Sequence, residues 1–123
     1  MDIKKCVYVI GNKSLKRCYV GETNNIHRRI SQHMDLLISG KHYSKSMQMD
    51  YDKYDTLDAI NILDCNERTK QERKILEKIV MLIYLKNGWQ LYNSNPIPNK
   101  SNLEWHIMYD LLEDTKNHLV GDI

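Results

Sequence analysis

The sequence predicts an α+β domain in which a small three-stranded antiparallel sheet is flanked by helices. Three short apolar runs have the composition of buried strands. Longer stretches with apolar residues at helical spacing follow them. The order strand, strand, helix, strand, helix, with an extra C-terminal helix, is typical of one sheet covered by helices. The 123 residues suffice for one modest core, so we expect one domain over residues 1–95, with a linker and helix over residues 96–123 packed on it.

The first two strands are predicted to form a hairpin. Residues 6–10 are a continuous apolar run rich in β-branched side chains, and residues 18–20 are a second run. Turn-forming residues separate them, namely Gly11, Asn12 and Ser14. Gly21 ends the second run, which indicates an unusual backbone conformation or a close neighbour at that position. The third strand is expected over residues 57–63.

The first helix is predicted over residues 23–39. Its apolar residues recur at every third or fourth position and form one stripe, which consists of Ile26, Ile30, Met34 and Leu37. Thr23 or Asn24 can cap the start of this helix, and Gly40 can end it.

Two further helices are predicted, and one segment is left open. Residues 41–55 are polar and aromatic, so they form either a loop or a short helix. The helix over residues 69–86 has the widest apolar stripe and is expected to be the most buried. The last helix follows Ser101 and Glu104, which match a capping box.

Charge is distributed unevenly along the chain. The net charge of +2 is too small to indicate a nucleic-acid-binding protein by itself. In residues 1–46, however, nine basic residues face three acidic ones, a surplus of +6, so that the remainder is net acidic. We expect one end of the molecule to present a basic surface to phosphate groups; the alternative is a lopsided solvated surface.

The cysteines and the hydropathy pattern indicate a cytoplasmic protein. The three cysteines, Cys6, Cys18 and Cys65, have no metal-binding spacing. Cys6 and Cys18 each open an apolar run and are expected to be core residues in a reducing, intracellular environment. We expect no signal peptide and no interaction with a membrane, because no apolar stretch approaches the length that spans one.

Two tyrosine-containing segments resemble the paired motif of the GIY-YIG nucleases. They are Cys6-Val7-Tyr8, which lacks the glycine of the first motif, and Tyr19-Val20-Gly21. In that family the motifs lie on neighbouring hairpin strands, followed by an arginine and histidines, a metal-binding glutamate on a later helix, and a terminal asparagine. The resemblance extends over about residues 4–95. It implies that these positions are here Tyr8, Tyr19, Gly21, Arg29, His33, His42, Glu77 and Asn93.

The chemistry of phosphodiester hydrolysis gives these residues roles. One carboxylate can hold Mg²⁺ (or Mn²⁺), because such an ion keeps most of its waters, and the ion stabilises developing charge. Arg29 can clamp the phosphate with paired hydrogen bonds. The resemblance implies a tyrosine general base; we favour Tyr8, with Tyr19 orienting water or substrate, although the two roles can be exchanged. His33 and His42 can assist proton transfer or bind phosphate.

Nearby cations and polar residues are assigned supporting roles. Lys16 or Arg17, just before the second motif, is placed to lower the pKa of a phenol and to contact substrate. Gly21 and Asn93 are further candidates for substrate binding, with the alternative that Asn93 merely caps backbone groups.

The metal-binding glutamate is chosen between two residues of the second long helix. Glu72 lies in the first turn, where a carboxylate suits the helix dipole. Glu77 lies at the flank of the apolar stripe, from which it can reach a cleft, and its spacing to Asn93 agrees with the resemblance. We expect Glu77 to bind one divalent ion.

The predicted function is a metal-dependent endonuclease that hydrolyses DNA. The alternatives are a non-catalytic DNA-binding module on the same scaffold and a partner-binding adaptor whose tyrosines belong to the core. The expected partner is DNA, and a homodimer is one way for such a domain to gain specificity. A phage, a mobile element or a bacterium that defends itself against one is the expected source, and the residues do not decide among them.

Overall fold

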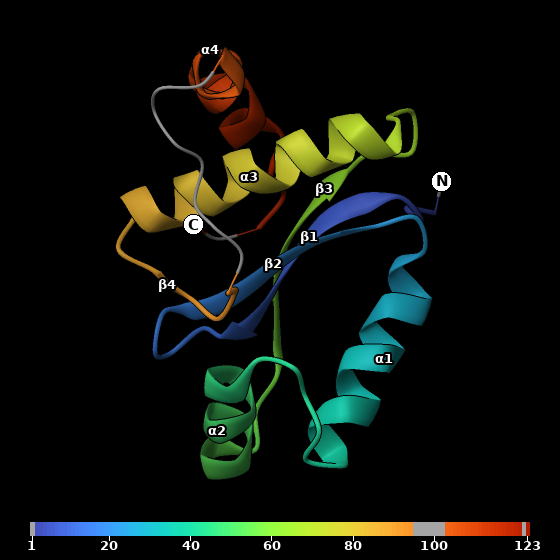
Figure 1. Cartoon of the computed structure of the whole chain (residues 1–123), viewed down its shortest axis with the longest axis vertical. Coiled ribbons are helices and arrows are strands. Elements are labelled where there is room, and N and C mark those ends of the chain that lie inside the picture. Colours follow the sequence, from blue (N-terminus) through green and yellow to red (C-terminus); the bar gives the residue numbers. More distant parts are fainter. Residues whose placement is uncertain (1, 95–102, 122) are drawn as a thin grey trace.

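The computed structural model describes residues 2–94, 103–121 and 123. The described chain is an α+β fold with one mixed sheet and helices on both of its faces (Figure 1). In chain order its elements are β1 (Cys6–Asn12), β2 (Arg17–Thr23), α1 (Ile26–Ile38), α2 (Lys45–Tyr54), β3 (Asp58–Asp64), α3 (Lys70–Lys86), β4 (Gln90–Leu91) and α4 (Leu103–His118). The α+β class is therefore confirmed. The division at residue 95 falls where the chain is not described and stays a prediction.

The sheet has one more strand than the sequence predicted. Its order is β3-β1-β2-β4, with β1 antiparallel to both neighbours. The additional strand β4 runs parallel to β2 and pairs through Gln90 and Leu91 only. The expectation of three strands, all antiparallel, was wrong in this detail, because a two-residue strand is too short to show any periodicity.

The two faces of the sheet carry different clusters of side chains. Along β1, Val7 and Val9 point to the face that α3 covers, whereas Tyr8 and Ile10 point to the face of α1 and α2. Figure 1 shows the two layers, with α3 and α4 on one side of the sheet and α1 and α2 on the other. The α1–α2 face is where the predicted catalytic tyrosine lies.

The ends of the helices explain most of the element bounds. Helix α1 begins three residues later than predicted, because Thr23 belongs to β2 and Asn25 is the cap that accepts from the Arg28 N–H at 3.1 Å. Residues 41–55, which were expected to form either a loop or a short helix, contain helix α2, and Ser44 caps it. Gly40 follows α1 with a φ of 73°, as a residue that ends a helix often does. Ser101 of the predicted capping box lies outside the described residues.

Helix α4 packs on α3 through Leu112, which contacts Ile79 and Ile83.

All three cysteines are buried and free, as expected for Cys6 and Cys18. Among the described residues, no helix combines the length and the hydropathy that crossing a membrane requires.

Candidate active site

Tyr8 and Gly21 face each other across the hairpin. They are register partners in β1 and β2, and a β-carbon on Gly21 would overlap the Tyr8 hydroxyl and the ring carbon that bears it. The phenol therefore crosses the neighbouring strand at the one position where no side chain stands in its way. The expected close neighbour of Gly21 is thus the ring of Tyr8.

A chain of hydrogen bonds leads from the start of α2 to the Tyr8 hydroxyl. The Ser44 backbone N–H donates to Nδ1 of His42 at 3.0 Å, so the proton of a neutral His42 ring is on Nε2. That nitrogen lies 2.8 Å from Nδ1 of His33, and Nε2 of His33 lies 2.8 Å from the Tyr8 oxygen. Each neutral ring therefore donates toward Tyr8, whose oxygen is the final acceptor.

Burial keeps both histidines neutral. His33 is 1% exposed, and desolvation, with His42 and Arg29 adding to it, lowers the pKa of His33 from 6.5 to about 4. Desolvation also lowers the pKa of His42. The direction of the chain is consequently fixed over the neutral pH range.

Two further tyrosine rings surround this chain. The ring centre of Tyr19 lies 5.0 Å from that of His33 and 6.4 Å from that of Tyr8. The ring centre of Tyr43 lies 4.2 Å from that of His42. No role was assigned to Tyr43 in the sequence analysis, although an aromatic residue directly after His42 in a polar segment was a usable signal.

Arg29 lies next to the same phenol. It hydrogen-bonds the Tyr8 oxygen, and both this bond and its positive charge lower the pKa of Tyr8. Burial nevertheless raises the pKa of Tyr8, and that of Tyr19, above the ordinary value for tyrosine. A phenol pKa below normal was expected from nearby cations alone; in the folded protein desolvation outweighs the cation.

A cavity of about 390 Å³ opens beside these groups. Arg29, His33 and Tyr43 line it together with Gln32, Asp35 and Leu36 of α1. Tyr8 itself is only 2% exposed, so the cavity approaches it from the side of Arg29 and His33.

Glu77 approaches the site from α3. It is half-buried, and its charge acts on both Tyr8 and Tyr19. Burial and the neighbouring Glu22 raise the pKa of the Glu77 carboxyl, while a hydrogen bond with the Glu22 backbone opposes that rise. Glu72, the rejected alternative, bonds instead to the Thr69 N–H at 3.0 Å and caps α3.

Glu22 is held by a buried ion pair. Nε of Arg73 lies 3.1 Å from the Glu22 carboxylate, and the two side chains are 6% and 12% exposed. Neither residue was assigned a role from the sequence. Their pairing fixes the end of β2 against α3, next to Glu77.

Asn93 completes the edge of β2 beside the site. Its side-chain oxygen accepts from the Val20 N–H at 2.9 Å, and its side-chain nitrogen donates to the Val20 oxygen at 2.7 Å. The amide thus takes the place of a strand residue beyond the two residues of β4. This is the arrangement of the alternative in which Asn93 caps backbone groups.

Lys16 and Arg17 lie at the other end of β2. Arg17 forms an ion pair with Asp50 at 3.0 Å and also bonds to Gln90. The Lys16 ammonium lies 3.4 Å from the Asn87 oxygen. The described contacts do not bring either cation to Tyr8, and Arg29 takes the place that the sequence assigned to them.

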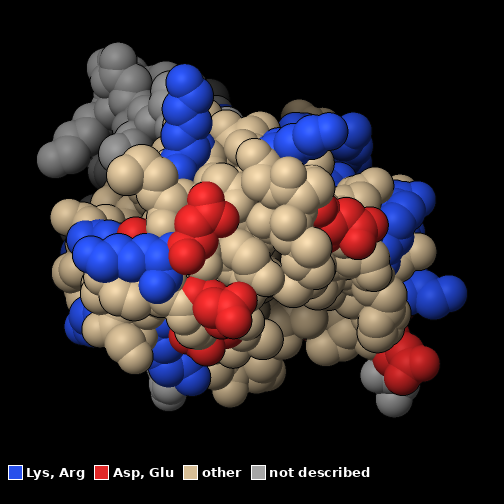
Figure 2. Space-filling model, turned by 90° about the horizontal axis from the view of Figure 1, so that it is seen from below, with Lys and Arg blue, Asp and Glu red and all other residues tan. Residues whose placement is uncertain are grey.

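Charges of both signs are mixed on the α2 end of the molecule. Figure 2 shows basic and acidic side chains interspersed over this face. The expected surface of one sign is not what this face presents, because acidic residues of α2, such as Asp50, lie among the basic residues of the N-terminal part.

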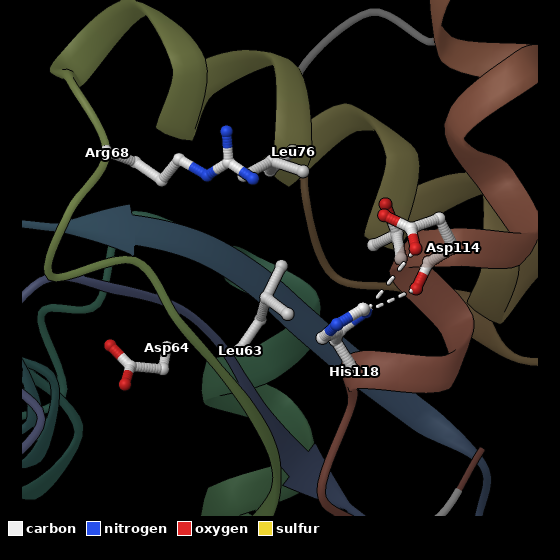
Figure 3. A pocket seen from close by; sticks show the side chains of 7 residues that line it. Leu63, Asp64, Arg68, Leu76, Asp114 and His118 are labelled. Carbon is white, nitrogen blue, oxygen red and sulfur yellow. Dashed lines mark hydrogen bonds and ion pairs between the residues drawn. The ribbon is translucent and has the colours of Figure 1, made fainter.

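A second cavity lies away from these residues. It encloses about 160 Å³ between the end of β3, α3 and α4, where Leu63, Arg68 and Asp114 line it (Figure 3). His118 donates there to the Asp114 backbone oxygen at 2.7 Å. None of the residues predicted to carry chemistry lines this cavity.

Comparison with known proteins decides the family. The family model of the GIY-YIG catalytic domain matches residues 4–80. The chain belongs to this family. GIY-YIG domains are nucleases, so the family implies a nuclease-type function for this chain. No curated protein and no solved structure matches the chain.

Proposed function

We propose that this GIY-YIG protein is a metal-dependent endonuclease that hydrolyses phosphodiester bonds of DNA. One observation supports this most strongly. Tyr8 receives hydrogen bonds from both His33 and Arg29, beside an open cavity and within reach of the Glu77 charge. A core tyrosine needs one hydrogen-bond partner; two donors aimed at one phenol oxygen favour the phenolate.

The proposed general base is Tyr8. As the phenolate, its oxygen accepts from His33 and Arg29 and keeps a lone pair for the proton of an attacking water. The water oxygen then bonds to phosphorus, the bond from phosphorus to one ester oxygen breaks, and that oxygen leaves and takes up a proton from solvent water. Tyr19, next to both His33 and Tyr8, is placed to orient the water.

Arg29 has a second role in this proposal. Its guanidinium both bonds Tyr8 and lines the cavity, so it can bind a phosphate oxygen while it stabilises the base. His42 acts through His33 and is a positioning residue.

Glu77 is the proposed metal ligand. Among the described residues no group of three or more His, Cys, Asp or Glu side chains is arranged to hold a metal ion. The half-buried Glu77 carboxylate suits Mg²⁺ or Mn²⁺, because such ions bind through one or two carboxylates and keep several waters. A bound ion would supply positive charge for the phosphate and the leaving oxygen.

The roles of the remaining candidates are narrower. Asn93 and Gly21 shape the site, since Asn93 bonds Val20 and Gly21 leaves space for Tyr8. Lys16 and Arg17 would contact DNA at a distance from the scissile bond. The ion pair of Arg17 with Asp50 partly neutralises the charge that Arg17 can offer to a phosphate.

The test is cleavage of supercoiled, linear and single-stranded DNA with Mg²⁺ or Mn²⁺ and with EDTA. We expect cleavage that EDTA abolishes and that Glu77→Gln lowers by at least about 100-fold, the effect of losing a group that stabilises transition-state charge. Glu67→Gln, an exposed glutamate before α3, is the matched control. Cleavage by Glu77→Gln at the parental rate overturns the assignment, and DNA binding without cleavage in any divalent ion favours the non-catalytic module.

A further inference from the structure

The cavity beside Arg29 extends well beyond the residues that the proposed chemistry uses. Gln32, Asp35 and Leu36 line its outer part, and neither the sequence nor the family gave these residues a role. Arg29, Gln32, His33 and Leu36 are spaced by three, four and seven positions, so they share one face of α1. The phosphate-binding arginine and the outer part of the cavity are therefore on one continuous surface.

Tyr43 forms a wall of this cavity and is unusually exposed for its size. Its side chain is 59% exposed, yet its ring packs on His42 with a centre-to-centre distance of 4.2 Å. Its hydroxyl lies 3.4 Å or more from Tyr19 and His33, so these hydrogen bonds are weak. Contacts of the ring, rather than of the hydroxyl, hold Tyr43 in place.

The loop that carries Tyr43 is fixed on both sides. The Lys41 N–H donates to the Leu36 oxygen at 2.8 Å. The Ser44 hydroxyl donates to the Tyr92 backbone oxygen at 2.8 Å. The exposed ring is therefore an ordered platform, and ordering it costs no further conformational entropy when a ligand stacks on it.

The chemistry of the lining selects a nucleobase over a second phosphate. A carboxylate at Asp35 repels phosphate but accepts hydrogen bonds from the exocyclic amino group of a base. The Gln32 amide both donates and accepts, as a base edge requires. A volume of about 390 Å³ is within the range of small-molecule sites.

We propose that this cavity receives the base of a nucleotide next to the phosphate held by Arg29. The base stacks on Tyr43, and its amino-bearing edge contacts Asp35 and Gln32. The inference rests on the proposed function, because it takes the ligand to be a nucleic acid. It adds a base-binding subsite, and hence a source of sequence preference, next to the reaction centre.

The test measures binding of fluorescent single-stranded DNA in EDTA, so that it does not depend on cleavage. Stacking of one base on an aromatic ring typically changes the affinity about fivefold or more. We expect Tyr43→Ala to weaken binding by this amount, Tyr43→Phe to bind like the parent, and Tyr54→Ala, an exposed tyrosine of α2, to leave affinity unchanged. On strands with abasic sites throughout, Tyr43→Ala should have no effect.

A second variant tests the edge contact. Asp35→Asn is expected to reduce the preference for adenine- or cytosine-containing strands over thymine-only strands, because an amide can donate where the carboxylate only accepts. Equal losses for Tyr43→Ala on intact and abasic strands, or no loss on either, overturn the subsite. Failure of Glu77→Gln to affect cleavage would instead concern the proposed function, and the binding result would stand.

Discussion

The Tyr8 ring lies across β2 at Gly21, its register partner, and fills the space that any other side chain would occupy. This relationship explains why the two motifs are spaced as they are. A tyrosine on one strand of a tight hairpin can reach the far edge of the other strand only over a glycine. The hydroxyl thereby arrives where His33 and Arg29 bind it.

Gly21→Ala is expected to lower both stability and activity. The added methyl group overlaps the Tyr8 phenol, and such overpacking costs about 1–3 kcal/mol. Chemical denaturation measures the stability change. Combined with Tyr8→Ala, which removes the overlapping ring, Gly21→Ala should cost less than the two single changes added together. Strict additivity would show that the two residues do not interfere.

The strands and helices with strong local patterns were predictable. The continuous apolar run of β1 and the apolar stripe of α1 are set by which side chains are buried in the core, so the sequence shows them directly. Strand β4 was not predictable, because its pairing with Arg17 and Cys18 depends on the position in space at which α3 ends. The cap of α1 is Asn25 and not the expected Thr23 or Asn24, because β2 extends through Thr23. That extension depends on pairing with β1 and not on the local sequence.

The site was predictable as a set of residues but not as a network. Resemblance identified Tyr8, His33 and His42, but it did not give their order or the direction of their hydrogen bonds. That direction depends on one backbone N–H, at Ser44. The burial that raises the pKa of Tyr8 likewise comes from packing of distant segments and not from the local pattern.

Substitution of His42 tests the direction of the chain. His42→Ala removes the donor that fixes His33 and is expected to lower cleavage about 10- to 100-fold, the loss typical of a partner that orients a functional group. A glutamine amide can still donate from the position of Nε2, so His42→Gln should recover part of the activity. Equal activity of the two variants would mean that His42 acts only by filling space.

Folding stability is expected to fall in acid because of His33. Its pKa is about 4 in the folded protein and 6.5 when unfolded, so between these values the unfolded chain binds more protons. The stability is therefore fully present above about pH 6.5 and is lost as pH falls toward 4, by on the order of 3 kcal/mol. The difference in unfolding free energy between the parent and His33→Gln, measured across this window, should change by that amount. A constant difference would contradict the lowered pKa.

Cleavage is expected to become faster as pH rises. The proposed base is the Tyr8 phenolate, and burial raises the pKa of Tyr8, so only a small fraction is ionised near neutrality. Below the operative pKa the rate should grow about tenfold per pH unit. Single-turnover cleavage at saturating Mg²⁺ between about pH 6 and pH 9 measures the slope, and Tyr8→Phe should be inactive throughout. A flat profile would favour a base other than a buried tyrosine, because burial raises the pKa of Tyr19 as well.

Replacement of Asn93 separates its two interpretations. Its side chain satisfies both backbone groups of Val20, and leaving such groups unpaired costs about 1–3 kcal/mol each. Asn93→Ala should therefore lower the unfolding free energy, and Asn93→Asp should lower it further, because its carboxylate has no proton to donate and its negative charge repels the Val20 oxygen that it faces. The exposed neighbour Ser94 offers Ser94→Ala as the control, which should be neutral. A loss of DNA affinity with unchanged stability would instead place Asn93 on the substrate.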